Sequence, residues 1–128
     1  MNREQMARQF AIAGEQKIDN DLTDTDLLDF RFSLIYEEVL ELSDAIDQVI
    51  LDKIHGDVKQ STKENLLKEL ADIQYVLSGF AVVFGFNLEE AYRRVHESNM
   101  TKFPLTKRED GKVMKGENYK EPVLEDLV

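Results

Sequence analysis

Two short acidic runs hold the residues of this sequence that are best placed to do chemistry. They are residues 37–41 (EEVLE) and, about thirty residues later, residues 69–72 (ELAD). Each run has acids three residues apart, and in a helix this spacing places both side chains on one face. Like charges about 4–6 Å apart in a partly dry site repel by several kcal/mol. Such a cluster therefore persists only when it binds a cation, shares protons or spreads into water, and its acids would be Glu38, Glu41, Glu69 and Asp72.

Hydrophobic periodicity predicts that both runs lie on long helices. We expect an all-α chain with helices at about 3–18, 26–54, 62–84 and 88–99, followed by an irregular tail over 100–128. Ser61 and Glu64 fit a capping box at the start of the third helix. Helical placement puts Glu38 at the margin of an apolar stripe, with Glu41 next to it. Glu69 and Asp72 stand at the head of another stripe, so both acid pairs border apolar surface.

The length and composition indicate one domain, residues 1–128, with an ordinary hydrophobic content of 42%. From residue 73 onward the third helix is apolar nearly all round, which favours burial between subunits. There is no cysteine, which excludes disulfides, thiolate metal sites and a catalytic thiol. The polar start lacks the apolar stretch of a signal peptide, and no apolar run is long enough to span a bilayer. We therefore expect a cytoplasmic protein without a membrane partner.

The charge balance argues against a nucleic-acid partner. The net charge is −10, whereas nucleic-acid binding needs a basic face. Residues 93–120 differ from the rest, because eight lysines and arginines there outnumber four acids. One interpretation is a solvated tail that evens out the charge. The other is a strip that contacts an anionic ligand brought to the acidic cluster by a metal.

The donor types of the acid pairs suit a hard cation. Carboxylates without cysteine or a nearby histidine favour Mg²⁺, with Mn²⁺ as a substitute. A di-iron bundle would need Glu-x-x-His pairs, and neither His55 nor His96 is placed three residues after a glutamate. Surface charge on amphipathic helices is the plain alternative. Mg²⁺ held by helices is typical of enzymes that neutralise a polyphosphate and activate water, and Glu37 is placed to orient or deprotonate that water.

Two segments resemble the all-α nucleoside triphosphate pyrophosphohydrolases, a superfamily of MazG-like proteins, dimeric dUTPases and phosphoribosyl-ATP pyrophosphohydrolases. The segments are residues 31–42 (RFSLIYEEVLEL) and 68–77 (KELADIQYVL). They contain the superfamily motif, Glu-x-x-Glu followed by Glu-x-x-Asp. Residues 95–103 resemble its Asn-x-x-Lys segment, and residues 110–119 resemble the C-terminal segment of a MazG-like subgroup.

The resemblance implies a four-helix core whose long helices pair in a homodimer or homotetramer. It implies Mg²⁺ at the two acid pairs, with catalytic roles for Glu37 and Glu38. The reaction would cleave nucleoside or deoxynucleoside triphosphates between the α and β phosphates, with dUTP and non-canonical nucleotides among the candidates and housecleaning as the role. The residues implied to contact the sugar or phosphates are Asn99, Lys102, Lys112, Lys115 and Tyr119.

The N-terminal helix matches the subgroup pattern only in part. Phe10 and Gln16 fit it and could stack on and hydrogen-bond to the base, whereas Gly14, Glu15 and Lys17 depart from it. The base preference is therefore open, and Phe10 as a plain core residue is an alternative. Two other functions stay open at this point: a phosphoribosyl-ATP pyrophosphohydrolase of histidine biosynthesis, and a non-catalytic helical oligomerisation or regulatory module.

Overall fold

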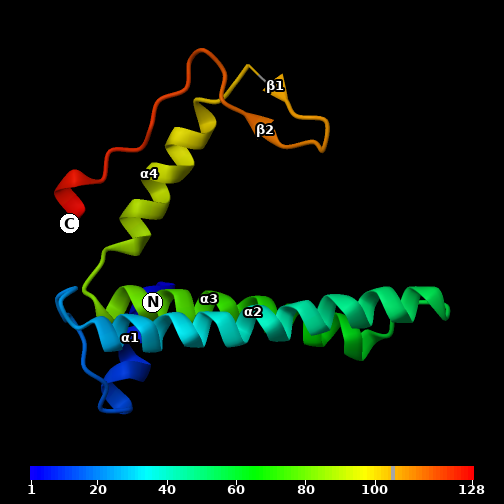
Figure 1. The fold of residues 1–128 in the computed structure, drawn as a ribbon, viewed down its shortest axis with the longest axis horizontal. Helices are drawn as coiled ribbons and strands as arrows, with labels where there is room; N and C mark the ends of the chain where they lie inside the picture. Colours follow the sequence, from blue (N-terminus) through cyan, green and yellow to red (C-terminus); the bar gives the residue numbers. More distant parts are fainter. Residues whose placement is uncertain (105) are drawn as a thin grey trace. The chain divides into compact units, whose positions relative to one another are not determined.

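The computed structural model describes residues 1–104 and 106–128, and it confirms an all-helical chain with four α-helices (Figure 1). These residues form two compact units, 1–85 and 86–128. The prediction that residues 1–128 make one domain stays a prediction. Among the described residues, no single helix is long and apolar enough to cross a membrane, and only α3 (Gln60–Val83) and α4 (Leu88–Met100), taken as a bent pair, reach that length and composition.

Helix α1 spans Arg3–Ala13 and is shorter than the predicted 3–18. Asn2 caps it, because its side chain accepts from the backbone N–H of Gln5 and the Gln5 side chain accepts from the N–H of Asn2. The helix ends early because Glu15 takes a left-handed conformation, with φ 55°. The buried face of α1 consists of small residues, and they pack against the C-terminal half of α3: Ala7 and Ala11 against Val82.

Helices α2 (Thr25–Ile54) and α3 (Gln60–Val83) form a long antiparallel hairpin (Figure 1). Asp52 fastens the turn between them. Its carboxylate accepts from Gln48 Nε2 at 2.8 Å, from the Lys59 backbone N–H at 3.1 Å and from Thr62 Oγ1 at 2.5 Å. The predicted capping box of Ser61 and Glu64 is wrong, since α3 begins at Gln60 and has no side-chain cap of its own.

Much of the predicted apolar stripe of α2 is not covered within the chain. Val39, Ile46 and Ile50 are 45%, 44% and 53% exposed. The interior of the hairpin instead holds one small apolar side chain and two charged ones from α2, Ala45, Arg31 and Asp52. A thirty-residue helix therefore leaves a row of large apolar side chains open to a further partner.

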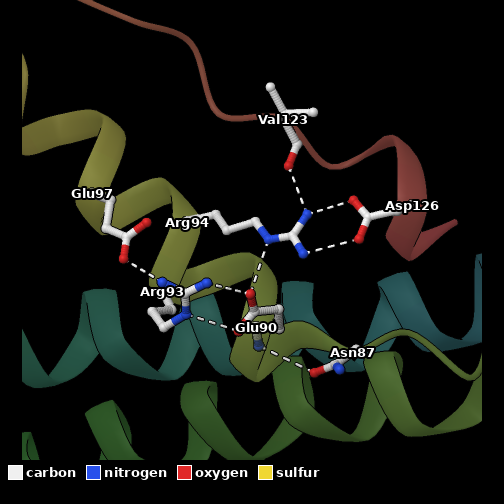
Figure 2. A network of polar contacts seen from close by, with 7 residues as sticks. All are labelled: Asn87, Glu90, Arg93, Arg94, Glu97, Val123 and Asp126. Carbon is white, nitrogen blue, oxygen red and sulfur yellow. Dashed lines mark hydrogen bonds and ion pairs between the residues drawn. The ribbon is translucent and has the colours of Figure 1, made fainter.

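The second unit is built from α4 (Leu88–Met100) and the tail. Asn87 caps α4 through the backbone N–H of Glu90. Figure 2 shows Arg94 joining the helix to the C-terminal end of the chain, because its guanidinium contacts Glu90, the Val123 carbonyl oxygen and both oxygens of Asp126. The tail was predicted to be irregular throughout, but it holds a short antiparallel ribbon and a 3₁₀ turn: β1 (Thr106–Lys107), β2 (Val113–Met114) and η1 (Glu125–Leu127).

Candidate metal centre

The two acid pairs meet where α2 and α3 pack side by side. One carboxylate oxygen from each of the four acids lies within 4.8 Å of the others. The i, i+3 spacing directs each pair to one face of its helix, and the antiparallel hairpin turns those faces toward each other. Helical placement thus brings together the four residues that the sequence singled out: Glu38 and Glu41 from α2, and Glu69 and Asp72 from α3.

The cluster lies partly inside the protein. Glu69 is 6% exposed, Glu38 and Asp72 are half-buried, and Glu41 is open to solvent. The Oε2 atoms of Glu38 and Glu69 are buried and have no hydrogen-bond partner among the described residues. A buried carboxylate oxygen without a partner costs free energy, because it has lost water and gained nothing in return. The site is therefore short of a positively charged or hydrogen-bonding ligand.

The electrostatics lead to the same conclusion. Burial raises the pKa of Glu38, and the negative charge of Glu41 and then of Asp72 and Glu69 raises it further. Lys68 offers partial compensation, with Nζ 2.7 Å from Asp72 Oδ2 and 3.4 Å from Glu69 Oε1. Hydrogen bonds to these two acids raise the pKa of Lys68. Its ammonium contacts only the α3 pair, so no cation of the described residues forms an ion pair with Glu38 or Glu41.

The donor set fits a hard divalent cation. All donors are carboxylate oxygens, which suit Mg²⁺ or Mn²⁺ better than softer metals. Two orphaned carboxylate oxygens are the ligands that such an ion would satisfy. The arrangement can therefore bind a metal ion.

The other residues predicted for this unit lie outside the cluster. Glu37 is exposed on α2, next to Glu38 in sequence, and contributes no oxygen to the group of four. Phe10 is 55% exposed, and its ring meets the edge of the Tyr75 ring at a centroid distance of 5.7 Å. It is thus not a plain core residue. Gln16 lies in the loop after α1 and lines a separate cavity with Arg31.

The predicted tail residues lie in the unit formed by residues 86–128, and three of them come together. Lys115 Nζ is 4.8 Å and Lys102 Nζ 5.9 Å from the centre of the Tyr119 ring. Gly116 permits this approach, because a Cβ there would lie 2.8 Å from the Lys102 carbonyl oxygen. Asn99 and Lys112 are exposed and do not join this group. Contact of any of these residues with substrate stays a prediction.

The basic strip over 93–120 is less free than its composition indicated. Arg93 contacts Glu90 and Glu97, and Arg94 contacts Glu90 and Asp126. Arg94 therefore joins α4 to the C-terminal end of the chain, whereas the Arg93 pairs stay within α4. Hydrogen bonds from Arg93 and Arg94 hold the pKa of Glu90 at about 2. Lys68 was not predicted as part of the site, although its position four residues before Asp72 indicates an i, i+4 ion pair.

An all-helical chain whose paired helices bring Glu-x-x-Glu and Glu-x-x-Asp together has the architecture of the all-α pyrophosphohydrolases. The sequence model described as phosphoribosyl-ATP pyrophosphohydrolase matches residues 8–99. The chain belongs to this family, which confirms the resemblance. It is a hydrolase that acts on phosphoric anhydrides, so the alternative of a non-catalytic module is set aside. A search of curated proteins gave no match.

Proposed function

We propose that the protein is a Mg²⁺-dependent pyrophosphohydrolase of nucleoside and deoxynucleoside triphosphates that releases a nucleoside monophosphate and pyrophosphate. The observation that carries the proposal is the carboxylate group of Glu38, Glu41, Glu69 and Asp72, with two buried oxygens that lack a partner. A polyphosphate cannot approach such a cluster without cations between them, and Mg²⁺ supplies that neutralisation as well as a more acidic water when bound. Mn²⁺ is expected to substitute for it.

The side chains around the cluster are proposed to have different roles in proton transfer, positioning and substrate binding. Glu37 is exposed beside the cluster, so its carboxylate is free to accept a proton from the water that attacks the α-phosphorus. The bond between the α-phosphorus and the bridging oxygen then breaks, and pyrophosphate leaves with that oxygen. Glu38 contributes one carboxylate oxygen to the cluster and is next to Glu37 in sequence. It therefore positions Glu37, the general base, relative to the reacting phosphate. Asn99, Lys102, Lys112, Lys115 and Tyr119 are proposed to contact the sugar or phosphates.

A second substrate has a specific argument in its favour. The family model that matches residues 8–99 is described by phosphoribosyl-ATP, whose triphosphate would undergo the same cleavage. The proposed chemistry at the cluster does not distinguish the two substrates, because it concerns only the α and β phosphates. The choice depends on the base and sugar contacts, for which Phe10 and Gln16 are the proposed residues. A housecleaning role toward non-canonical nucleotides and a cytoplasmic location stay predictions.

One assay tests both substrates. Pyrophosphate release is measured on the four common deoxynucleotides, dUTP, the ribonucleotides and phosphoribosyl-ATP, each with Mg²⁺ and with EDTA. We expect Mg²⁺-dependent release that Glu38→Gln reduces by at least a hundredfold, and that the exposed Glu64→Gln leaves unchanged. Release from no substrate, or equal rates in the Glu38→Gln protein, would refute the proposal.

We also propose that the protein is a homodimer or homotetramer joined through the hairpin of α2 and α3. The exposed apolar row of Val39, Ile46 and Ile50 is continuous along one helix, and a row of this size is typical of an interface. Sedimentation equilibrium measures the assembly directly. Ile50→Lys places a charge in the row and is expected to dissociate the oligomer. Asp44→Asn, which makes the same one-unit charge change at an exposed position on a different face of α2, is the matched control. A monomeric wild type would contradict this.

A further inference from the structure

Arg31 is a buried cation for which the described part of the chain supplies no ion-pair partner. It lies in the second turn of α2, is 7% exposed, and its Nε is buried without a hydrogen-bond partner among the described residues. Across the helix interface Gly79 leaves room for it, because a Cβ on Gly79 would collide with Arg31 Nη2. Burial lowers the pKa of Arg31, yet a guanidinium stays protonated in proteins. The hairpin therefore carries a positive charge that is largely removed from water.

Such an arrangement is rare unless something negative completes it. Arginine is almost never fully buried unless it is paired, since a charge removed from water must regain its lost solvation from other groups. Asp19, in the loop before α2, is not that partner, because it binds Arg8 at 2.6 Å. The missing partner is an anion that the chain itself does not supply among its described residues.

Arg31 opens onto a cavity that is separate from the acidic cluster. The cavity has a volume of about 290 Å³ and is lined by Gln16, Lys17, Leu27, Phe30, Arg31 and Val83. It contains a second cation, Lys17, and an amide donor, Gln16. All six residues belong to the unit of residues 1–85, so one compact body builds the whole site.

The loop that carries the two polar residues is fixed at both ends. The backbone N–H of Gln16 donates to the Ala11 carbonyl oxygen at 2.9 Å, and that of Asp19 donates to the Val82 carbonyl oxygen at 3.2 Å. Asn20 adds backbone and side-chain hydrogen bonds to the Val83 carbonyl oxygen. The side chains of Gln16 and Lys17 are thus presented from an anchored segment.

The cavity and the acidic cluster lie along the same seam, the interface between α2 and α3, and are two helical turns apart. Arg31 precedes Glu38 by seven residues on α2, and Gly79 follows Asp72 by seven residues on α3. Seven residues return to the same helical face and advance about 10 Å along the axis. The two sites are therefore built on backbone positions about two helical turns apart.

We propose that this cavity binds the phosphomonoester group of a small ligand such as a nucleoside monophosphate or a sugar phosphate. Arg31 pairs with the phosphate oxygens from the buried side, and Lys17 provides the second positive charge. Two cations match a phosphate dianion better than a carboxylate, which carries one charge. The exposed ring of Phe30 and the side chain of Leu27 supply apolar contact for the sugar or base.

Calorimetric titration of the full chain in EDTA tests this without any dependence on the metal site or on hydrolysis. The probes are inorganic phosphate, a deoxynucleoside monophosphate and ribose 5-phosphate. We expect saturable binding of phosphate, with tighter binding of whichever organic phosphate is the natural ligand. Lys17→Met is expected to weaken binding about tenfold, and Gly79→Ala is expected to weaken it by displacing the guanidinium. Lys63→Met, which removes an exposed charge outside the cavity, is expected to change nothing.

Arg31→Met separates a ligand-binding role from a structural one. We expect it to abolish phosphate binding while melting at the same or a higher temperature in phosphate-free buffer, because it removes an unpaired buried charge. Glu38→Gln should retain phosphate binding, so failure of the metal site is distinguished from failure of this one. The proposal is overturned when no probe binds the wild type, or when Lys17→Met and Arg31→Met bind like it. Dissociation of an oligomer by Arg31→Met with phosphate binding intact would also overturn it, and would assign Arg31 to a carboxylate of a second copy.

Discussion

Removal of one charge from the acidic cluster should stabilise the metal-free protein. Glu38 is the best choice, because its Oε2 is buried without a partner and Lys68 contacts only the other helix's acids. Glu38→Gln keeps the shape of the side chain and provides an amide that can donate to the neighbouring carboxylates. The same change removes a metal ligand, so it should abolish the stabilisation by Mg²⁺. The two effects have opposite signs in a single variant.

The magnitude follows from the spacing of the oxygens. Two unit charges 4.8 Å apart repel by about 3 kcal/mol at an effective dielectric of about 20, and by under 1 kcal/mol in bulk water. Glu38 is half-buried and faces three other acids, one of which already pairs with Lys68 at 2.7 Å. We therefore expect the free energy of unfolding in EDTA to rise by about 1–3 kcal/mol, which for a chain of this size raises the melting temperature by about 3–10 °C.

Thermal melts in EDTA and in Mg²⁺ measure both effects. The wild type should gain about 2.7 kcal/mol at a hundred times its Mg²⁺ dissociation constant, and Glu38→Gln should gain nothing comparable. Because the folded-state pKa of Glu38 is raised above 4.5, the metal-free wild type should also gain stability as the pH falls through that raised value, and the variant should not. The exposed Glu64→Gln is the control. A variant that melts lower than the wild type in EDTA, or keeps the Mg²⁺ shift, would refute the reasoning.

Three further predictions concern other parts of the chain. Glu37→Gln should retain the Mg²⁺-dependent rise in melting temperature but lose about 10²–10⁴ in turnover, since Glu37 lies outside the group of four and is proposed to accept the proton. Asp52→Asn should remove an acid transition. Hydrogen bonds from Thr62, Gln48 and the Lys59 N–H hold the pKa of Asp52 at about 2, against 3.8 when unfolded. The contribution of Asp52 to the free energy of unfolding is therefore complete above pH 3.8 and is lost as the pH falls toward 2. Urea melts at pH 2.5 and pH 6 check this, and an equal pH dependence in the variant would contradict it. Arg94→Gln should release the C-terminal end of the chain to limited proteolysis, while Arg108→Gln, which breaks the pair with Asp110, should not.

The sequence was sufficient for the acidic cluster because every step depends on local geometry. The i, i+3 spacing fixes the direction of each carboxylate pair, and a short connection between two long helices makes them antiparallel neighbours. The margin position of Glu38 beside an apolar stripe indicated partial burial, which the structure confirms. The predicted capping box at the start of α3 was wrong because a longer-range contact fixes that end of the helix. Asp52, eight residues before the first residue of that helix, binds the Lys59 N–H and Thr62, and no local motif indicates this.

The charged residues whose surroundings were not predicted depend on residues that are distant in the sequence. One of the two interpretations of the basic residues over 93–120 was that they contact an anionic ligand. The positions of Glu90 and Glu97, three or four residues from Arg93 or Arg94, indicate ion pairs within the helix. Asp126, however, lies 32 residues from Arg94 and pairs with it only because the tail folds back. Arg31 is the reverse case. It appears in the sequence as an ordinary helical arginine, and only Gly79, 48 residues away, shows that it is enclosed.

The hairpin thus holds two incomplete charge sites of opposite sign on one seam, and this arrangement predicts coupling between them. At about 10 Å, the cluster and Arg31 are too far apart to form an ion pair, but a charge at one site still changes the energy of a charge at the other by about 1–2 kcal/mol per unit charge at an effective dielectric of about 20. A phosphate on Arg31 repels the empty carboxylate cluster and attracts a cation bound there. Mg²⁺ should therefore tighten phosphate binding at least severalfold, and phosphate should tighten Mg²⁺ binding by the same factor. Titrations of phosphate with and without Mg²⁺ measure the factor in the wild type, and Glu38→Gln should reduce it toward one. Salt should also reduce it, because the Debye length at 0.15 M is about 8 Å. Equal phosphate affinities with and without Mg²⁺ at low salt would show that the two sites are independent.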